Sequence, residues 1–113
     1  MYDYLKVQLI QIIEELNNLV YGIDRQYYDE LILRHRTITN VIYMSREYKD
    51  VDMDIFVLIL KDKIRLEQLL MRAYTKRYFA NDINYEEYSD LTNESEIVIE
   101  TYSEVIEFID SHK

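Results

Sequence analysis

The sequence predicts an all-α protein, a single-domain antiparallel up-down-up-down four-helix bundle. The chain has no proline and one glycine, Gly22, and such scarcity of turn-forming residues favours long uninterrupted helices. Apolar residues also recur at helical spacing along nearly its whole length. The connections between these segments are short, so consecutive helices must be antiparallel neighbours. At 113 residues, we expect one helical domain, 1–113, with a buried core.

The first two helices are predicted at about 2–21 and 25–49. Gly22 is expected to end the first as a left-handed C-cap, and Asp24 suits the N-cap of the second. The seam of the first helix repeats at alternating steps of four and three residues, through Leu5, Leu9, Ile12, Leu16, Leu19 and Ile23.

The third helix, predicted at 52–79, is expected to be central in the fold. Its first turns contain six consecutive large apolar residues, 55–60. A run of this kind has no polar side, so we expect it to be covered all round. Asp50 or Asp52 is expected to cap the start of the helix.

The fourth helix, predicted at 84–111, has the most regular pattern. Asn84 with Glu87 three residues later resembles a capping box. The apolar seam then repeats to the end of the helix, through Tyr88, Leu91, Ser95, Val98, Tyr102, Val105 and Ile109.

The formal net charge of −9 is concentrated at the end of the chain. Residues 81–113 hold ten acids and one base, whereas residues 51–80 sum to +2. A block of one sign indicates a charged surface. We expect ion pairs along the seam between the third and fourth helices, from Lys61, Arg65, Arg72 and Lys76 to nearby carboxylates.

Several functional classes lack their usual sequence signals. Cysteine is absent, which excludes disulfides, thiol nucleophiles and cysteine zinc sites. No apolar run has the length of a membrane span, and the start does not resemble a signal peptide. We therefore expect a cytoplasmic protein without a membrane partner. With two histidines and no recognisable nucleophile–base arrangement, we expect no catalytic residues and no cofactor.

The segment from Asp50 to Asp54 begins like an EF-hand calcium loop. The resemblance ends there, because Ile55 replaces the turn glycine and Lys61 replaces the bidentate glutamate. Acids at a helix start are explained by capping and by the helix dipole. We therefore expect no metal at this segment.

Two other acidic segments, Glu14 to Asn18 and Glu47 to Asp50, resemble the E-E-x-x-E and E-x-x-D motifs of MazG-type nucleotide pyrophosphohydrolases. The resemblance implies a magnesium-dependent enzyme. Asn18 stands where the motif has a third acid. The bundle also separates Glu14 from Glu47 by roughly 20 Å at helical rise, which one metal ion does not bridge. This enzyme is kept as an alternative.

The leading interpretation is a non-enzymatic protein-interaction module. The abundance of residue types that AT-rich codons encode, together with the small size and acidity, suggests a phage or mobile-element inhibitor or regulator that binds a host or defence protein. Binding is expected through the acidic fourth helix, the tyrosine-rich end, or both. The residues expected to contact the partner are Glu96, Ile97, Glu100, Glu104, Glu107, Phe108, Tyr78 and Tyr85.

The bundle model places the first and third loops at one end of the molecule, where tyrosines would gather. This tyrosine-rich end is expected to contain Tyr21, Tyr27, Tyr28, Tyr74, Tyr78, Phe79, Tyr85 and Tyr88.

Two further alternatives to the interaction module are a DNA mimic and a helical chaperone-like binding module. Nucleic acid is not the expected partner, and a homodimer is left open.

Polar residues interrupt the four seams at one predicted height. They are Gln11, His35, Glu67 and Ser95. We expect a structural polar layer near the middle of the bundle, centred on a hydrogen bond or ion pair between His35 and Glu67, because an unpaired buried charge costs several kcal/mol. Its expected role is to fix helix register.

Overall fold

The computed structural model describes residues 1–19, 22 and 24–112, and it confirms the predicted all-α fold. In the described residues there are four helices and no strands. None of these helices has the length and apolar composition needed to cross a membrane. The helices are α1 (Tyr2–Asn18), α2 (Arg25–Glu47), α3 (Met53–Phe79) and α4 (Tyr85–Ser111).

The main difference in helix boundaries is at the end of α1. The helix stops at Asn18, and Leu19 is its C-cap with an extended backbone, so the predicted cap at Gly22 is wrong. Two consecutive asparagines explain the earlier end, because their side chains compete for backbone hydrogen bonds. The rest of the predicted first helix at 20–21, and Ile23, lie outside the described residues.

Two of the predicted N-caps are confirmed. The Asp52 carboxylate accepts a hydrogen bond from the Asp54 N–H at 3.0 Å, and the Asn84 side-chain oxygen accepts one from the Glu87 N–H at 2.8 Å. Asp24 occupies the N-cap position of α2 without a side-chain cap hydrogen bond. These caps fix the residues at which α3 and α4 begin.

The turn between α3 and α4 begins with a Schellman motif. Asn81 has a left-handed backbone, with φ of 62°, which asparagine tolerates better than most residues. The Asn81 N–H donates to the Tyr78 carbonyl, and the Asp82 N–H donates to the Arg77 carbonyl. These bonds satisfy the end of α3 and reverse the chain within five residues, so α4 runs back along α3.

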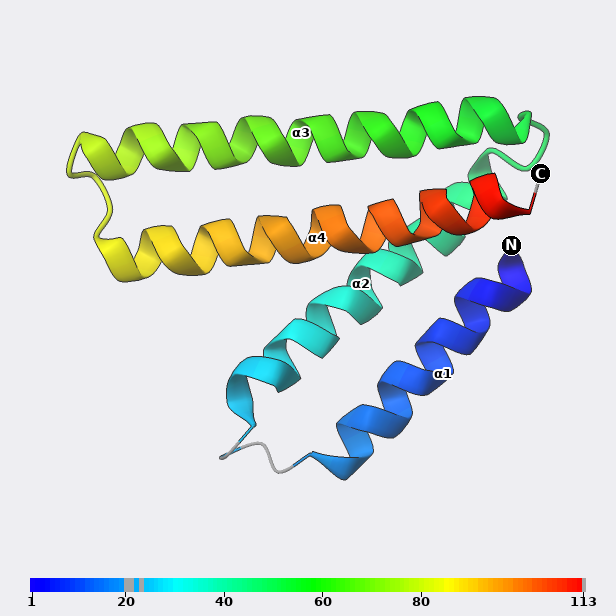
Figure 1. Cartoon of the computed structure of the whole chain (residues 1–113), viewed down its shortest axis with the longest axis horizontal. Coiled ribbons are helices and arrows are strands. Elements are labelled where there is room, and N and C mark those ends of the chain that lie inside the picture. The colour runs from blue at the N-terminus through cyan, green and yellow to red at the C-terminus, as the bar shows by residue number, and fades with distance from the viewer. Residues whose placement is uncertain (20–21, 23, 113) are drawn as a thin grey trace.

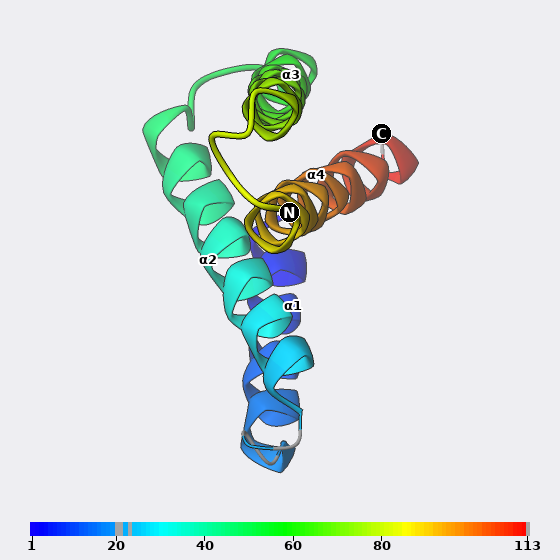
Figure 2. The same ribbon diagram turned by 90° about the vertical axis from the view of Figure 1, so that its left-hand side faces the viewer.

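The four helices form two antiparallel hairpins that cross each other (Figures 1 and 2). The hairpin of α3 and α4 is long and closely packed, and α2 packs against both α1 and α4. In both views α3 lies above α4 and α1 lies below it. The contacts are consistent with a bundle, but α2 crosses α4 obliquely and does not run along α3. Only α2 and α4 therefore connect the two hairpins extensively.

The core lies where the two hairpins cross. The apolar run at the start of α3 contributes Phe56, Val57 and Leu60, which are buried. Ile55 and Leu58 are exposed, so the prediction that this run is covered all round is wrong. The reason is that α3 is packed closely only on the side that faces α4. The other core residues are Leu5, Ile12, Leu31, Ile38, Val41, Ile42, Tyr102, Val105, Ile106 and Ile109.

Two isoleucines of α1 provide a matched test of this core. Ile12 is buried, whereas Ile10, half a turn away, is about half exposed. Ile12→Ala should lower the free energy of unfolding by about 2–5 kcal/mol, because it leaves a cavity between α1 and α2. Ile10→Ala should cost less than about 1 kcal/mol. Urea unfolding followed by circular dichroism measures both, and equal losses would contradict the packing of α1.

Candidate functional site

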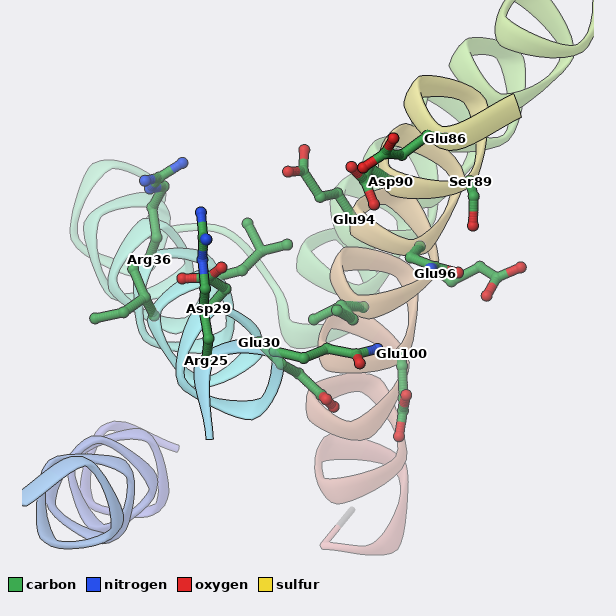
Figure 3. A pocket seen from close by; sticks show the side chains of 15 residues that line it. Arg25, Asp29, Glu30, Arg36, Glu86, Ser89, Asp90, Glu94, Glu96 and Glu100 are labelled. Atoms are coloured by element: carbon green, nitrogen blue, oxygen red, sulfur yellow. The ribbon is translucent and has the colours of Figure 1, made fainter. Parts of the chain in front are cut away.

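A wide groove lies between the N-terminal halves of α2 and α4 (Figure 3). It forms because the two helices diverge away from their crossing point (Figure 1). Its volume is about 1020 Å³, which is at the upper end of the range for ligand sites. The residues that line it are Arg25, Gln26, Asp29, Glu30, Ile32, Leu33, Arg36, Glu86, Ser89, Asp90, Asn93, Glu94, Glu96, Ile97 and Glu100.

The groove is strongly acidic, and its two walls differ. The α4 wall contributes five carboxylates and no base, whereas the α2 wall contributes two carboxylates and two arginines. In Figure 3, Glu94 extends from α4 toward α2. Among the described residues, none of the lining carboxylates forms an ion pair with Arg25 or Arg36. The groove lining therefore carries a formal net charge of about −5, from seven acids and two arginines. In the described part of the chain, no ion pair neutralises these acids.

The spacing of the α4 carboxylates works against helix stability. Glu86, Asp90 and Glu94 follow one another at intervals of four residues. Like charges at this spacing destabilise an isolated helix by a few tenths of a kcal/mol per pair. The mutual spacing of these three exposed acids therefore does not stabilise α4, although Glu86 in its first turn is favoured by the helix dipole. Ile97 supplies an apolar surface beside them.

An ion pair closes the groove where α2 and α4 converge. An Arg34 guanidinium nitrogen lies 2.6 Å from a Glu104 carboxylate oxygen, and both side chains are partly buried. Burial lowers the pKa of Arg34, but the hydrogen bond and the charge of Glu104 outweigh burial and raise that pKa above its usual value. Sequence reasoning missed this pair, because 70 residues separate the partners and no motif connects them.

The predicted partner-binding residues of α4 have different surroundings. Glu96, Ile97 and Glu100 line the groove. Glu104 is occupied by Arg34. Phe108 is partly buried, because its ring stacks on that of Tyr4 with centroids 3.9 Å apart. It also packs against the His112 ring at 4.1 Å. Glu107 is exposed. The structure therefore brings together only the first three of these residues.

The other two predicted contact residues lie at the far tip of the α3–α4 hairpin. The Tyr78 ring stacks on that of Tyr88 at 4.9 Å and meets the edge of Tyr85 at 6.1 Å. Phe79 is exposed beside them. The end of α1 and the start of α2 lie at a different end of the molecule (Figures 1 and 2), and Tyr21 lies outside the described residues. The prediction of one shared tyrosine-rich end is wrong, because the hairpins cross and do not align.

The predicted ion pairs between α3 and α4 do not form among the described residues. Arg65 pairs instead with Asp62 of its own helix, at 3.8 Å, and Lys61, Arg72 and Lys76 have no ion pair there. The interhelical ion pair of α4 is made with α2. The difference follows from the crossing, which places α2 alongside carboxylates that the bundle model assigned to α3.

The residues of the predicted polar layer differ in burial. Ser95 is buried, His35 and Glu67 are half-buried, and Gln11 is exposed. Among the described residues, no hydrogen bond or ion pair joins any two of these four side chains. Glu67 instead lies near Tyr102, whose pKa is raised by burial and by the charge of Glu67. A structural role for the layer stays a prediction.

The acids of the two MazG-like segments are all exposed. They are Glu14, Glu15, Glu47 and Asp50. Glu15 accepts a hydrogen bond from the Tyr27 hydroxyl of α2, and this bond raises the pKa of Tyr27. Across the described parts of the chain, no three His, Asp or Glu side chains are grouped closely enough to hold a metal ion.

Comparisons of the chain with protein-family models, with curated proteins and with solved structures find no match.

The ion pair at the end of the groove provides a test of the α2–α4 packing. Glu104→Gln should lower the free energy of unfolding by about 1 kcal/mol, because it leaves the partly buried Arg34 without its charged partner. Glu107→Gln removes the same charge from an exposed site that forms no ion pair among the described residues, and should change stability by less than about 0.5 kcal/mol. Chemical unfolding at neutral pH measures both, and identical effects would contradict the pair.

Proposed function

We propose that this protein is a non-enzymatic interaction module that binds a basic segment of a partner protein in the groove between α2 and α4. The observation that supports the proposal is the α4 wall, where five carboxylates line the groove and no lining base of α4 balances them. A ligand with several Lys or Arg side chains would supply the missing positive charge. The proposed role is regulation or inhibition of that partner.

The shape of the groove favours a chain segment over a small molecule. The groove is open, and its lining spans three turns of α2 and about four turns of α4. An amphipathic helix or an extended peptide fits such a surface, with its basic side chains toward α4 and an apolar side chain on Ile97. Each exposed ion pair adds at most about 1 kcal/mol. Useful affinity therefore needs several pairs together with apolar contact.

The charge density of α4 fits the binding of a basic protein segment better than the imitation of a DNA duplex. Helix α4 has nine acids in its 27 residues, or about one charge per 4.5 Å at helical rise. Duplex DNA carries one charge per about 1.7 Å. The helix is too sparse to imitate a duplex, so DNA mimicry ranks below binding of a basic protein segment. Within this proposal, the protein would act in the cytoplasm as an inhibitor of a host or defence protein.

The test uses a fluorescent 20-residue peptide of Lys and Leu at helical spacing as the basic probe. The double substitution Asp90→Lys and Glu94→Lys should weaken binding at least tenfold, because it reverses two charges of the α4 wall. Glu47→Lys with Glu107→Lys makes the same change in net charge at exposed sites outside the groove, and should weaken it less than threefold. Fluorescence anisotropy at 50 and 300 mM salt measures both, with weaker binding at high salt.

Equal losses for the two double variants would show that the probe senses only net charge, and would contradict a groove site. Affinity capture from a lysate, with the wild type and the groove variant side by side, then identifies the partner as a protein lost from the variant. Magnesium-dependent hydrolysis of nucleoside triphosphates by the purified protein would instead support the pyrophosphohydrolase alternative.

A further inference from the structure

Helix α3 carries a second apolar seam on the side opposite α4. The seam repeats at steps of four, three, four, three and four residues, through Ile55, Ile59, Asp62, Leu66, Leu69 and Ala73. The helical rotation of 100° per residue places this seam about half a turn from the α4-facing residues Val57, Leu60, Ile64 and Met71. Five of its six positions are apolar. This is the heptad spacing at which one helix packs against another.

Five of the six side chains of this seam are exposed within the described structure, and Ile59 is partly buried. Ile55 is 52% exposed, Leu66 is 55% exposed and Leu69 is 50% exposed, while Leu58 and Leu70 on its flanks are 62% and 44% exposed. Single exposed leucines are ordinary, but a strip of them along one helix is a mark of an interface. At helical rise, residues 55–73 extend over about 27 Å.

We propose that this seam binds the same seam of a second copy of the chain, as an antiparallel pair of α3 helices. The two-fold axis passes between the two helices at the height of residue 64. In this register Ile59 meets the partner subunit's Leu69, and Ile55 meets the partner subunit's Ala73. Asp62 meets the partner subunit's Leu66. The two members of each pair lie equally far from the height of residue 64. Each contact therefore occurs twice, once from each copy, as a two-fold interface requires.

Charge selects the antiparallel orientation. Asp62 is the polar member of the seam, and a parallel pair in register would place it against the partner's Asp62, which is repulsive. The antiparallel pair places it beside the partner's Lys63 and Arg65. Among the described residues of one chain, the ion pair of Asp62 is the 3.8 Å contact with Arg65, in which both side chains are more than 70% exposed. Both groups are therefore free to form the closer intersubunit contact.

The proposed dimer leaves the acidic groove open. The groove lies between α2 and α4, while the seam lies on the side of α3 away from α4. A dimer would present two grooves, but its formation does not depend on either groove binding a ligand. The strip involves one helix from each copy and is short for an obligate interface, so the dimer should dissociate on dilution.

Sedimentation equilibrium over a hundredfold range of concentration tests the interface. The wild type should approach twice the 13.9 kDa of the monomer at high concentration. Leu66→Glu with Leu69→Glu should stay monomeric with the helical circular dichroism of the wild type. Val7→Glu with Ile10→Glu is the matched control, since both side chains are 49% exposed on α1, and it should dimerise like the wild type. A wild type that stays monomeric throughout would overturn the proposal.

The absence of cysteine allows a direct test of orientation, which also covers the case in which the double variant fails to fold. Ile59→Cys and Leu69→Cys chains, mixed and oxidised, should form a disulfide between positions 59 and 69. Each variant alone should form little, because the two equivalent positions lie about 15 Å apart along the axis. Efficient self-disulfides with no mixed product would overturn the antiparallel register.

Discussion

The structure depends on the packing of α2 across α4. Helix α1 is held mainly by α2, and α3 mainly by α4, so the α2–α4 crossing joins the two hairpins. Buried apolar side chains meet there, including Ile38 and Val41 of α2 and Val105 and Ile109 of α4. Burying each such side chain is worth about 1.5–3 kcal/mol. Apolar packing alone does not fix the orientation of α2 on α4. The ion pair between Arg34 and Glu104 depends on geometry and so helps to fix that orientation.

The crossing also determines which surfaces stay open. Because α2 covers only part of α4, the N-terminal half of α4 faces a groove and presents unpaired carboxylates. Because α2 does not run beside α3, the outer face of α3 keeps an apolar seam in solvent. One oblique contact thus produces both an acidic site for a basic partner and a strip suited to a second copy. In a closed bundle, both surfaces would be partly covered.

Local features of the fold were predictable because they depend on neighbouring residues. The caps at Asp52 and Asn84 follow from side chains that reach the next turn. The relative placement of helices was not predictable, because periodicity identifies an apolar seam without showing what covers it. Helix α3 has two such seams, and the run 55–60 contains members of both. Reflecting the helices through their turns assumed that all four helix axes are aligned, and therefore placed Glu104 beside α3, whereas its ion-pair partner is Arg34 of α2.

Within the candidate site, sequence reasoning identified the acidic helix but not its opposite wall. Glu96, Ile97 and Glu100 were predicted and line the groove. Arg25 and Arg36 were not predicted to lie opposite the acidic helix, since arginines on a helix usually face solvent and no sequence motif connects them with α4. The charge block in residues 81–113 indicated a surface but could not show which part the fold would cover.

Small-angle X-ray scattering tests the open, crossed arrangement most directly. The structure has a Cα radius of gyration of 15.9 Å and extents of 46 × 34 × 22 Å. A compact domain of this length would have a radius of gyration of about 13 Å. With the concentration series extrapolated to zero, where the monomer dominates, we predict a value near 15.9 Å and a scattering profile that matches two crossed hairpins. A value near 13 Å would show a closed bundle and contradict the account.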